Sequence, residues 1–193
     1  MNMIIFSIIA YLIGSIGTAV LVCKFLGLPD PRTEGSKNPG ATNVMRVGGK
    51  NAALIVLAAD GLKGFFPVLL AKIFGVGGFG LGIVALAATL GHIFPLYYGF
   101  KGGKGVATAI GGILGLSFIV GIVCAVAWFV TAIITKYASL SSLISVGIAP
   151  ILLLFLSNSA YFIPTLFIVG VVVWRHLENI ERLRAGTESK LEF

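Results

Sequence analysis

Charged residues are scarce in this chain of 193 residues, and their scarcity excludes a soluble domain. Only 11% of the residues are Asp, Glu, Lys or Arg, whereas 58% are hydrophobic and the mean hydropathy is +1.04. The surface of a soluble domain of this size needs more polar cover than these residues can supply. We therefore expect an integral membrane protein. The apolar runs are continuous rather than alternating, so we expect helices, which pair all their backbone groups internally.

Acidic residues and cysteines are too few, and too far apart, to suggest a metal site. Only seven acids are present, and Asp30, Glu34 and Asp60 do not form a metal-ligand cluster. The D-x-x-D-G pattern of metal-dependent phosphotransferases is missing. The two cysteines, Cys23 and Cys124, lie in apolar runs, where packing is a more common role than disulfide formation. We expect neither a metal nor a cofactor.

The stretch FKGGKGVATAIGG, residues 100–112, is rich in glycine but lacks the parts of a nucleotide-binding P-loop. The pattern G-x-x-x-x-G-K-[ST] requires a glycine where Tyr98 stands and a hydroxyl where Gly105 stands. What remains is a helix start with free N–H groups, glycines that admit an anion, and the charge of Lys104. These features favour a site for a phosphate monoester. The alternative is a flexible loop whose lysines reach lipid headgroups.

Basic residues outnumber acids by fourteen to seven, and their positions predict the topology. Short loops rich in lysine and arginine stay in the cytoplasm. The longest polar segment, residues 24–51, holds five such residues, and four more lie in the C-terminal tail from Arg175 onward. We expect both segments to be cytoplasmic, with the N-terminus outside. The net charge of +7 also suggests anionic lipid or an anionic substrate near these loops.

The apolar runs predict an all-α bundle of seven transmembrane helices, forming a single domain over residues 1–193. The first three spans cover residues 3–23, a run from about 52 to 75, and a run from about 79 to 97. No internal repeat and no separate soluble domain is apparent.

The fourth and fifth helices come from one uncharged run, residues 105–135. As a single helix this run would be about 45 Å long, against a hydrocarbon core of about 30 Å. We expect it to break near residues 116–121 into two short helices, with a partly re-entrant hairpin as the alternative. The polar stretch at residues 157–160 divides the last run into the sixth and seventh spans.

Three polar, basic segments lie on the predicted cytoplasmic side, and polar residues at a membrane edge are costly unless they serve a function. They are EGSKNPGATNVMR, YGFKGGKGVAT and RHLENIERLRAGTE. We expect them to converge on one site. In the first segment a helix is predicted to begin near Thr42 or Asn43, which can cap it, with Arg46 positioned to fork onto phosphate oxygens. A capped amphipathic helix lying on the membrane is the alternative.

Single polar residues elsewhere admit two interpretations. Asp60 and Lys63 lie three apart on one helix face, so we expect a mutually neutralising pair, with Lys63 adding positive field to the site. His176 and Asn179 lie one turn apart, which favours a site over an isolated interfacial histidine. His92 is a second candidate, and its alternative is a hydrogen-bonded histidine inside the bundle.

Taken together, these motifs resemble the acyl-phosphate:glycerol-3-phosphate acyltransferases of the PlsY family. The resemblance rests on four stretches in order along the whole chain: GSKNPGATNVMR, DGLKG, GHIFPLYYGFKGGKGVAT and RHLENIERLRAGTE. It implies a seven-helix, multi-pass enzyme of the bacterial inner membrane with its active site on the cytoplasmic side. Such an enzyme moves an acyl chain from acyl phosphate to the 1-hydroxyl of glycerol 3-phosphate, giving lysophosphatidic acid and phosphate.

The partners implied by this resemblance are acyl phosphate, glycerol 3-phosphate and membrane lipids, without nucleic acid. The enzyme that supplies acyl phosphate is a candidate protein partner. Transport of a small phosphorylated anion is the competing function. It predicts inverted repeats and helices broken at mid-membrane, whereas the polar residues of this chain cluster at one face.

The motifs and the resemblance together single out the site residues. The loop at residues 102–105 is expected to hold the phosphate of glycerol 3-phosphate, with Lys104 as its main charge. Asp60 and Glu188 are expected to be structural. The catalytic set is Ser36, Arg46, His176 and Asn179. The substrate-binding set is Asn43, Lys63, His92, Lys101, Gly102, Gly103, Lys104, Gly105 and Thr108.

The sequence offers two candidates for the proton acceptor. His176 and Glu181 have the spacing of the H-x4-D pair of soluble glycerophosphate acyltransferases but the wrong acid, and Tyr97 stands at the matching place after His92. Since acyl phosphate is already activated, our hypothesis is positioning plus charge stabilisation of the leaving phosphate, with a substrate phosphate taking the proton. A general base at His176 is the alternative.

Overall fold

Helices make up the regular structure of the computed structural model, which describes residues 2–191. In chain order they are α1 (Asn2–Gly14), α2 (Thr18–Phe25), α3 (Ala41–Ile73), α4 (Gly78–Ile93), the 3₁₀ turn η1 (Leu96–Tyr98), α5 (Val106–Leu116), α6 (Phe118–Thr135), α7 (Ala138–Gly147), α8 (Ala149–Leu156), the 3₁₀ turn η2 (Ser159–Tyr161), α9 (Phe162–Trp174) and α10 (Leu177–Arg184). Within residues 2–191, five helical stretches are long and apolar enough to cross a membrane, or six if the bent pair of η2–α9 and α10 counts as one span. The prediction of an all-helical membrane protein is confirmed.

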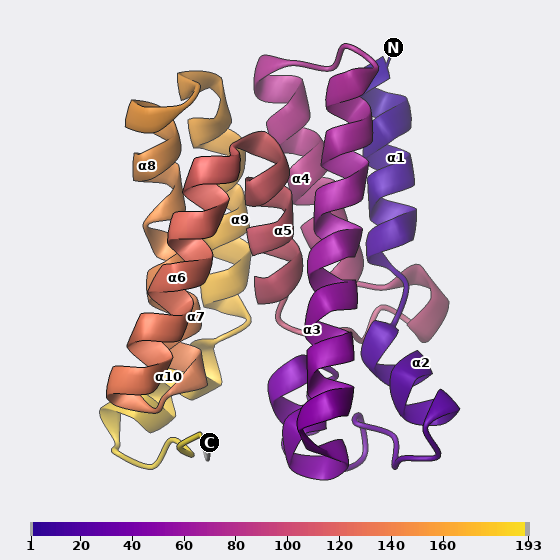
Figure 1. Cartoon of the computed structure of the whole chain (residues 1–193), viewed down its shortest axis with the longest axis vertical. Helices are drawn as coiled ribbons and strands as arrows, with labels where there is room; N and C mark the ends of the chain where they lie inside the picture. Colours follow the sequence, from indigo (N-terminus) through magenta and orange to yellow (C-terminus); the bar gives the residue numbers. More distant parts are fainter. Residues whose placement is uncertain (1, 192–193) are drawn as a thin grey trace.

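The breaks predicted inside the two long apolar runs are present. Ser117 separates α5 from α6 with an extended backbone, inside the predicted interval. Residues 157–158 separate α8 from η2. Figure 1 shows both turns at one end of the bundle, whereas the backbone N–H of Leu191 in the C-terminal tail donates to the carbonyl of Lys136 at the other end. The run over residues 105–135 is therefore two antiparallel helices.

The first apolar stretch is interrupted, although the sequence predicts one continuous helix. Residues 2–25 together are long enough for one span, but α1 ends at Gly14 and α2 begins at Thr18. Within this break the carbonyl of Ile16 accepts a hydrogen bond from Lys63 Nζ at 2.8 Å. The interruption therefore supplies a backbone acceptor to a buried charge on α3.

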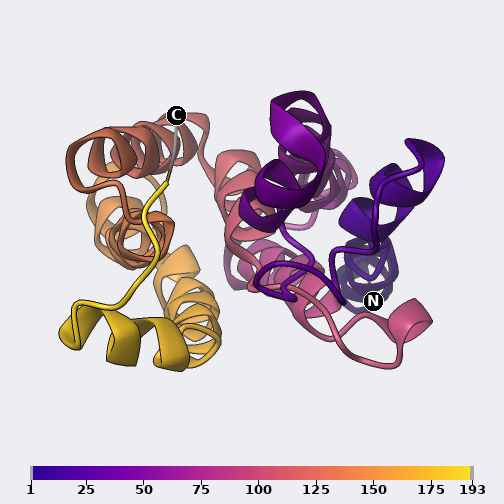
Figure 2. The same cartoon turned by 90° about the horizontal axis from the view of Figure 1, so that it is seen from below.

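The helices form two groups, α1–α5 and α6–α10, which lie side by side when the bundle is viewed along its length (Figure 2). Helices α3 and α5 approach closely within the first group, because glycines face each other there. A Cβ built on Gly111 would lie 2.0 Å from the carbonyl oxygen of Gly61. Small residues permit this kind of backbone approach between membrane helices. The close approach holds the polar loop that precedes α5 against the buried polar side chains of α3.

Apolar side chains from both groups share a buried core. Leu81 and Val84 of α4 pack in one cluster with Ile113 of α5 and Ile168 of α9. The two cysteines are buried and unpaired, as the sequence predicts. This core joins the two groups along the bundle, and their polar segments meet at one end.

Candidate active site

A cleft of about 1410 Å³ lies between the two groups of helices and runs from the polar loops to Phe118, next to the turn between α5 and α6. Its walls come from α3, α5, α6, α7 and α10 and from the loops before α3 and α5. The predicted site residues that line it are Ser36, Asn43, Arg46, Asp60, His92, Gly102, Lys104, Gly105, His176, Asn179 and Glu188. The three polar segments therefore converge, as the sequence predicts.

The second and third segments are joined by a chain of side-chain hydrogen bonds that begins at Lys104. Lys104 Nζ donates to Asn179 Oδ1, and Asn179 Nδ2 donates to Glu188 Oε1 at 2.7 Å. The other carboxylate oxygen of Glu188 accepts from Arg182 Nε, also at 2.7 Å. Glu188 thus holds the amide of Asn179 and the guanidinium of Arg182 in fixed positions. The carboxylate neutralises Arg182, whereas the nearest partner of Lys104 is an uncharged amide.

Lys104 is partly buried in the cleft, directly before the left-handed residue Gly105 that caps α5. Burial lowers the pKa of Lys104 to about 8; Glu188 opposes this shift, and the charges of Arg182 and Arg175 add to it. The ammonium group therefore carries its charge at neutral pH and loses it over a range that an assay can reach.

The first segment reaches the same cleft through Arg46, whose Nη2 donates to the hydroxyl of Ser189 at 2.9 Å. Ser36 is exposed, and its backbone N–H donates to Asn43 Oδ1 at 2.8 Å. The amide nitrogen of Asn43 donates to the carbonyls of Pro31 and Glu34. The buried amide of Asn43 therefore folds its own loop.

The predicted cap of the following helix is wrong. Helix α3 begins at Ala41, after Gly40, and no side chain bonds the N-terminal N–H groups as a cap. Asn43 does not cap this helix because all its amide groups are used within the loop before it. The helix then continues past a kink at Gly49 into the apolar span.

His176 lies at the junction of α9 and α10, with only 2% of its surface exposed. Its Nδ1 donates to the carbonyl of Val172 at 2.7 Å, so Nε2 is the nitrogen left without a proton in the neutral ring. Burial lowers the pKa of His176 to about 4, and the hydrogen bond to Val172 only partly offsets this. His176 is therefore neutral at pH 7 and a weak base.

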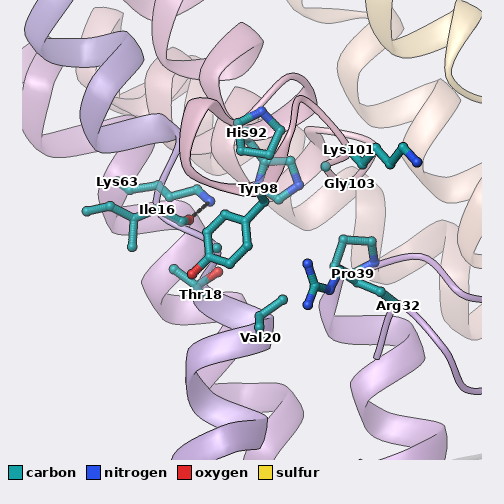
Figure 3. Close-up of a pocket in the computed structure, with 13 residues that line it drawn as sticks. Ile16, Thr18, Val20, Arg32, Pro39, Lys63, His92, Tyr98, Lys101 and Gly103 are labelled. Atoms are coloured by element: carbon teal, nitrogen blue, oxygen red, sulfur yellow. Dashed lines mark hydrogen bonds between the residues drawn. The ribbon is translucent and has the colours of Figure 1, made fainter. Parts of the chain in front are cut away.

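The remaining predicted residues lie on the other side of the glycine loop. Lys63, Lys101 and Gly103 line a second, much smaller pocket of about 20 Å³, and Figure 3 shows the Lys101 side chain pointing away from Lys63. His92 and Gly102 line both spaces. Thr108 is buried beneath the loop, with its hydroxyl 3.3 Å from His92 Nδ1. The predicted substrate-binding residues are thus divided between the large cleft on one side of the glycine loop and the small pocket on its other side.

Several polar residues of the cleft are absent from the predicted set, and three of them, Arg175, Arg182 and Ser189, hydrogen-bond to predicted site residues. Arg175 Nη2 donates to the carbonyl of Gly102 at 3.3 Å, which links the third segment to the glycine loop. Arg182 donates a hydrogen bond to Glu188. The hydroxyl of Ser189 accepts one from Arg46. These three residues belong to the third motif or directly follow it, so the motif itself was the available signal for them.

The sequence reasoning also missed the apolar wall of the cleft. Its side chains share one face of each helix at spacings of three and four residues, which is the signal that was available. The wall includes Leu57 and Phe65 of α3, Ile110 and Leu114 of α5, and Phe118, Ile122, Ala125 and Phe129 of α6.

Comparisons with known proteins agree with these features. The family model described as glycerol-3-phosphate acyltransferase matches residues 4–186. A glycerol-3-phosphate acyltransferase of Coxiella burnetii is 48% identical over 192 residues, covering 100% of both chains. One from Thioalkalivibrio sulfidiphilus is 48% identical over 183 residues, covering 94% of this chain and 90% of that protein.

Two solved structures are also similar. They are the glycerol 3-phosphate form and the lysophosphatidic acid form of PlsY, an integral membrane glycerol 3-phosphate acyltransferase. Their TM-scores are 0.92 and 0.91, at 37% and 36% identity, and each match covers 100% of this chain and 96% of the other. The resemblance inferred from the motifs is confirmed, and the chain belongs to the glycerol-3-phosphate acyltransferase family of the PlsY type.

Proposed function

We propose that this chain transfers a fatty acyl group from acyl phosphate to the 1-hydroxyl of glycerol 3-phosphate, releasing lysophosphatidic acid and phosphate. Members of its family are membrane glycerol-3-phosphate acyltransferases, which supports the acceptor and the product. One observation carries the proposal furthest: a single cleft places Lys104 and Arg46 in continuity with an apolar wall. Such a cleft suits two phosphate anions, one of which has a hydrocarbon tail.

The phosphate of glycerol 3-phosphate is assigned to the loop before α5. The similar PlsY structure in its glycerol 3-phosphate form supports a site for this substrate in the fold. The first N–H groups of α5 have no partner within the helix, and anions bind well at such helix starts. Lys104 adds a positive charge, and the phosphate replaces the neutral amide of Asn179 as its partner. Asn179 and Glu188 then serve to position Lys104.

Acyl phosphate is assigned to the opposite part of the cleft. Arg46, held by the hydroxyl of Ser189, faces the cleft from α3 and can fork onto two phosphate oxygens. The tail lies along α5 and α6. Since α5 has 11 residues, its apolar face rises about 16 Å from the phosphate loop, roughly half the hydrocarbon core. The tail therefore lies at membrane depth while the reacting carbonyl stays near the cations.

In the reaction, the 1-hydroxyl oxygen attacks the carbonyl carbon, and the bond from that carbon to the phosphate oxygen breaks. Arg46 and Lys104 stabilise the charge that gathers on the phosphates. The hydroxyl proton goes to a substrate phosphate, because His176 with a pKa of about 4 is a weak base in this environment. The chain supplies positioning and charge, and the donor supplies the activated carbonyl.

We further propose seven membrane crossings, with the N-terminus outside and the cleft facing the cytoplasm of a bacterial inner membrane. The positions of the basic residues support this orientation. The turns at Ser117 and at residues 157–158 lie together at the end opposite the polar loops, which supports seven crossings with α5 as one of them. The whole of residues 1–193 is treated as one domain, and the enzyme that supplies acyl phosphate remains a candidate partner at the cytoplasmic face.

Purified protein with acyl phosphate and labelled glycerol 3-phosphate tests the function. We expect labelled lysophosphatidic acid without added metal or coenzyme A. Replacing acyl phosphate by the same acyl chain as acyl-CoA is the matched control and is expected to give no product. Folded protein that yields no lysophosphatidic acid from acyl phosphate would overturn the proposal.

A further inference from the structure

We propose that four buried residues behind the glycine loop, Asp60, Lys63, His92 and Thr108, form a positioning unit for the acceptor site. They set the place of the turn at Gly102 and Gly103; Asp60 and His92 also border the cleft, whereas Lys63 and Thr108 do not line it. The inference rests on the proposed function, because the acceptor is taken to be glycerol 3-phosphate. It reassigns Lys63, His92 and Thr108, which the sequence alone places among the residues that bind substrate.

The turn at Gly102 and Gly103 rests directly on the end of α4. The N–H of Gly102 donates to the carbonyl of Ile93 at 3.1 Å, and the N–H of Gly103 donates to the carbonyl of His92 at 3.2 Å. A Cβ on Gly103 would lie 2.3 Å from His92 Nε2, and one on Gly102 would lie 2.0 Å from the His92 carbonyl oxygen. The His92 ring and backbone are thus the surface against which the turn is formed, so a shift of His92 displaces the turn.

The ring of His92 is held from its other side. Asp60 Oδ1 and Thr108 Oγ1 each lie 3.3 Å from His92 Nδ1. A carboxylate only accepts hydrogen bonds, so Nδ1 carries the proton, and Nε2 is the bare nitrogen that faces Gly103. The two oxygens come from α3 and α5. The orientation of the ring therefore depends on the packing of both helices.

Asp60 is fixed in turn by groups from the first apolar stretch. Its Oδ1 accepts from Lys63 Nζ at 2.8 Å and from the hydroxyl of Thr18 on α2. Lys63 Nζ also donates to the carbonyl of Ile16 at 2.8 Å, in the break between α1 and α2. A continuous chain of polar contacts thus runs from this break to the glycine turn. All four members of the positioning unit are 8% exposed or less.

Lys63 is separated from the proposed substrate by this arrangement. Figure 3 shows Lys63 reaching Ile16 beside His92 and Gly103 in the small pocket. That pocket of about 20 Å³ has room for about one water molecule and is too small for a phosphate. The carboxylate of Asp60 also neutralises its charge, whereas within residues 2–191 Lys104 on the cleft side makes no ion pair and bonds the amide of Asn179. The geometry therefore favours positioning over phosphate binding for Lys63.

The mildest test is Thr108→Val, which removes one hydroxyl and keeps the shape of the side chain. We expect the KM for glycerol 3-phosphate to rise about tenfold, with the KM for acyl phosphate unchanged, since misplaced binding groups typically cost one to two orders of magnitude. Thr108→Ser, which restores the hydroxyl, is expected to recover most of the affinity. A Thr108→Val enzyme with wild-type kinetics would count against the inference.

The sharper test is a double-mutant cycle on Asp60 and Lys63. Asp60→Asn and Lys63→Met each leave one buried group without its partner, whereas the combined variant replaces the charged pair by a neutral one. If the pair only positions the turn, the double variant binds glycerol 3-phosphate more tightly than the Lys63→Met variant does. If Lys63 contacts the phosphate, the double variant binds as weakly as Lys63→Met or more weakly, and the inference fails.

Binding of glycerol 3-phosphate, measured by calorimetry on folded protein, supplies a readout independent of turnover. Lys72→Met is the matched control, because Lys72 is an exposed lysine on the same helix, and its KM is expected to stay at the wild-type value. Wild-type protein that makes no lysophosphatidic acid would contradict the proposed function. Active wild-type protein whose variants all keep the wild-type KM and affinity would contradict the positioning unit alone.

Discussion

Two lysines flank the same glycine loop, and their surroundings make them different kinds of residue. Lys63 lies behind the loop, 2.8 Å from the carboxylate of Asp60, in a pocket with room for one water. Lys104 lies in front of it, held by the neutral amide of Asn179 in a cleft large enough for two substrates. A charge that is cancelled inside the protein organises structure, whereas a charge that keeps only an uncharged partner remains available to a ligand. Both lysines lie beside the glycine loop, so distance from the loop does not distinguish their roles. The group that each lysine bonds does distinguish them.

Replacing Lys104 tests the front side of the loop and is expected to have the largest effect. Lys104→Ala removes the side-chain charge assigned to the acceptor phosphate, so kcat/KM for glycerol 3-phosphate is expected to fall about a thousandfold. The melting temperature is expected to change little, because the carboxylate of Glu188 keeps its ion pair with Arg182 when Lys104 is removed. A large loss of thermal stability with an unchanged KM for glycerol 3-phosphate would instead assign Lys104 a structural role.

Replacing Lys63 tests the rear side and is expected to act first on stability. Lys63→Met leaves the carboxylate of Asp60 buried without its cation, which costs about 3–5 kcal/mol for a buried pair. Thermal unfolding in detergent, followed by circular dichroism, is expected to show a lower melting temperature than in the Lys104→Ala variant. Equal melting temperatures for Lys63→Met and Lys104→Ala would show that the ion pair of Asp60 and Lys63 does not stabilise the fold.

The pH dependence of acceptor binding sharpens the comparison further. Because the pKa of Lys104 is about 8, the lysine is a cation below this pH and becomes neutral above it. The second pKa of a phosphate monoester is about 6, so the substrate stays doubly charged over this range. The KM for glycerol 3-phosphate is therefore expected to rise above pH 8, by up to about tenfold per pH unit. In Lys104→Arg the rise is expected to disappear, since arginine keeps its charge.

His176 is expected to show the smallest effect. If a substrate phosphate accepts the proton, His176→Ala lowers kcat by about tenfold through lost positioning and leaves the shape of the pH profile unchanged. The measurement is kcat over a pH series at saturating concentrations of both substrates. A loss of several orders of magnitude with normal substrate binding would instead identify His176 as the general base.

Much of the fold follows from apolar length and charge. The break at Ser117 could be predicted because a helix over residues 105–135 is too long for a bilayer, and the convergence of the three polar segments could be predicted because they lie on one side. The break between α1 and α2 could not. Its apolar run is continuous, and the carbonyl that it exposes matters only because Lys63 comes from another helix to bind it.

The site was predictable as a set of residues but not as an arrangement. Motif matching places Lys63 and Lys104 in one substrate-binding group, because sequence order does not reveal which side of a loop a side chain occupies. Asn43 illustrates a different limit. Its residue type suits a helix cap, but the carbonyls that it binds belong to a loop whose path the sequence pattern does not specify.

The C-terminal tail has a practical consequence for handling the protein. Ser189 holds Arg46, Glu188 holds Asn179, and the N–H of the buried Leu191 donates to the carbonyl of Lys136. An affinity tag or fusion partner attached after these residues is expected to disturb the contacts of a segment that borders the cleft. A tag placed before α1 lies at the opposite end of the bundle (Figure 1) and leaves these contacts intact.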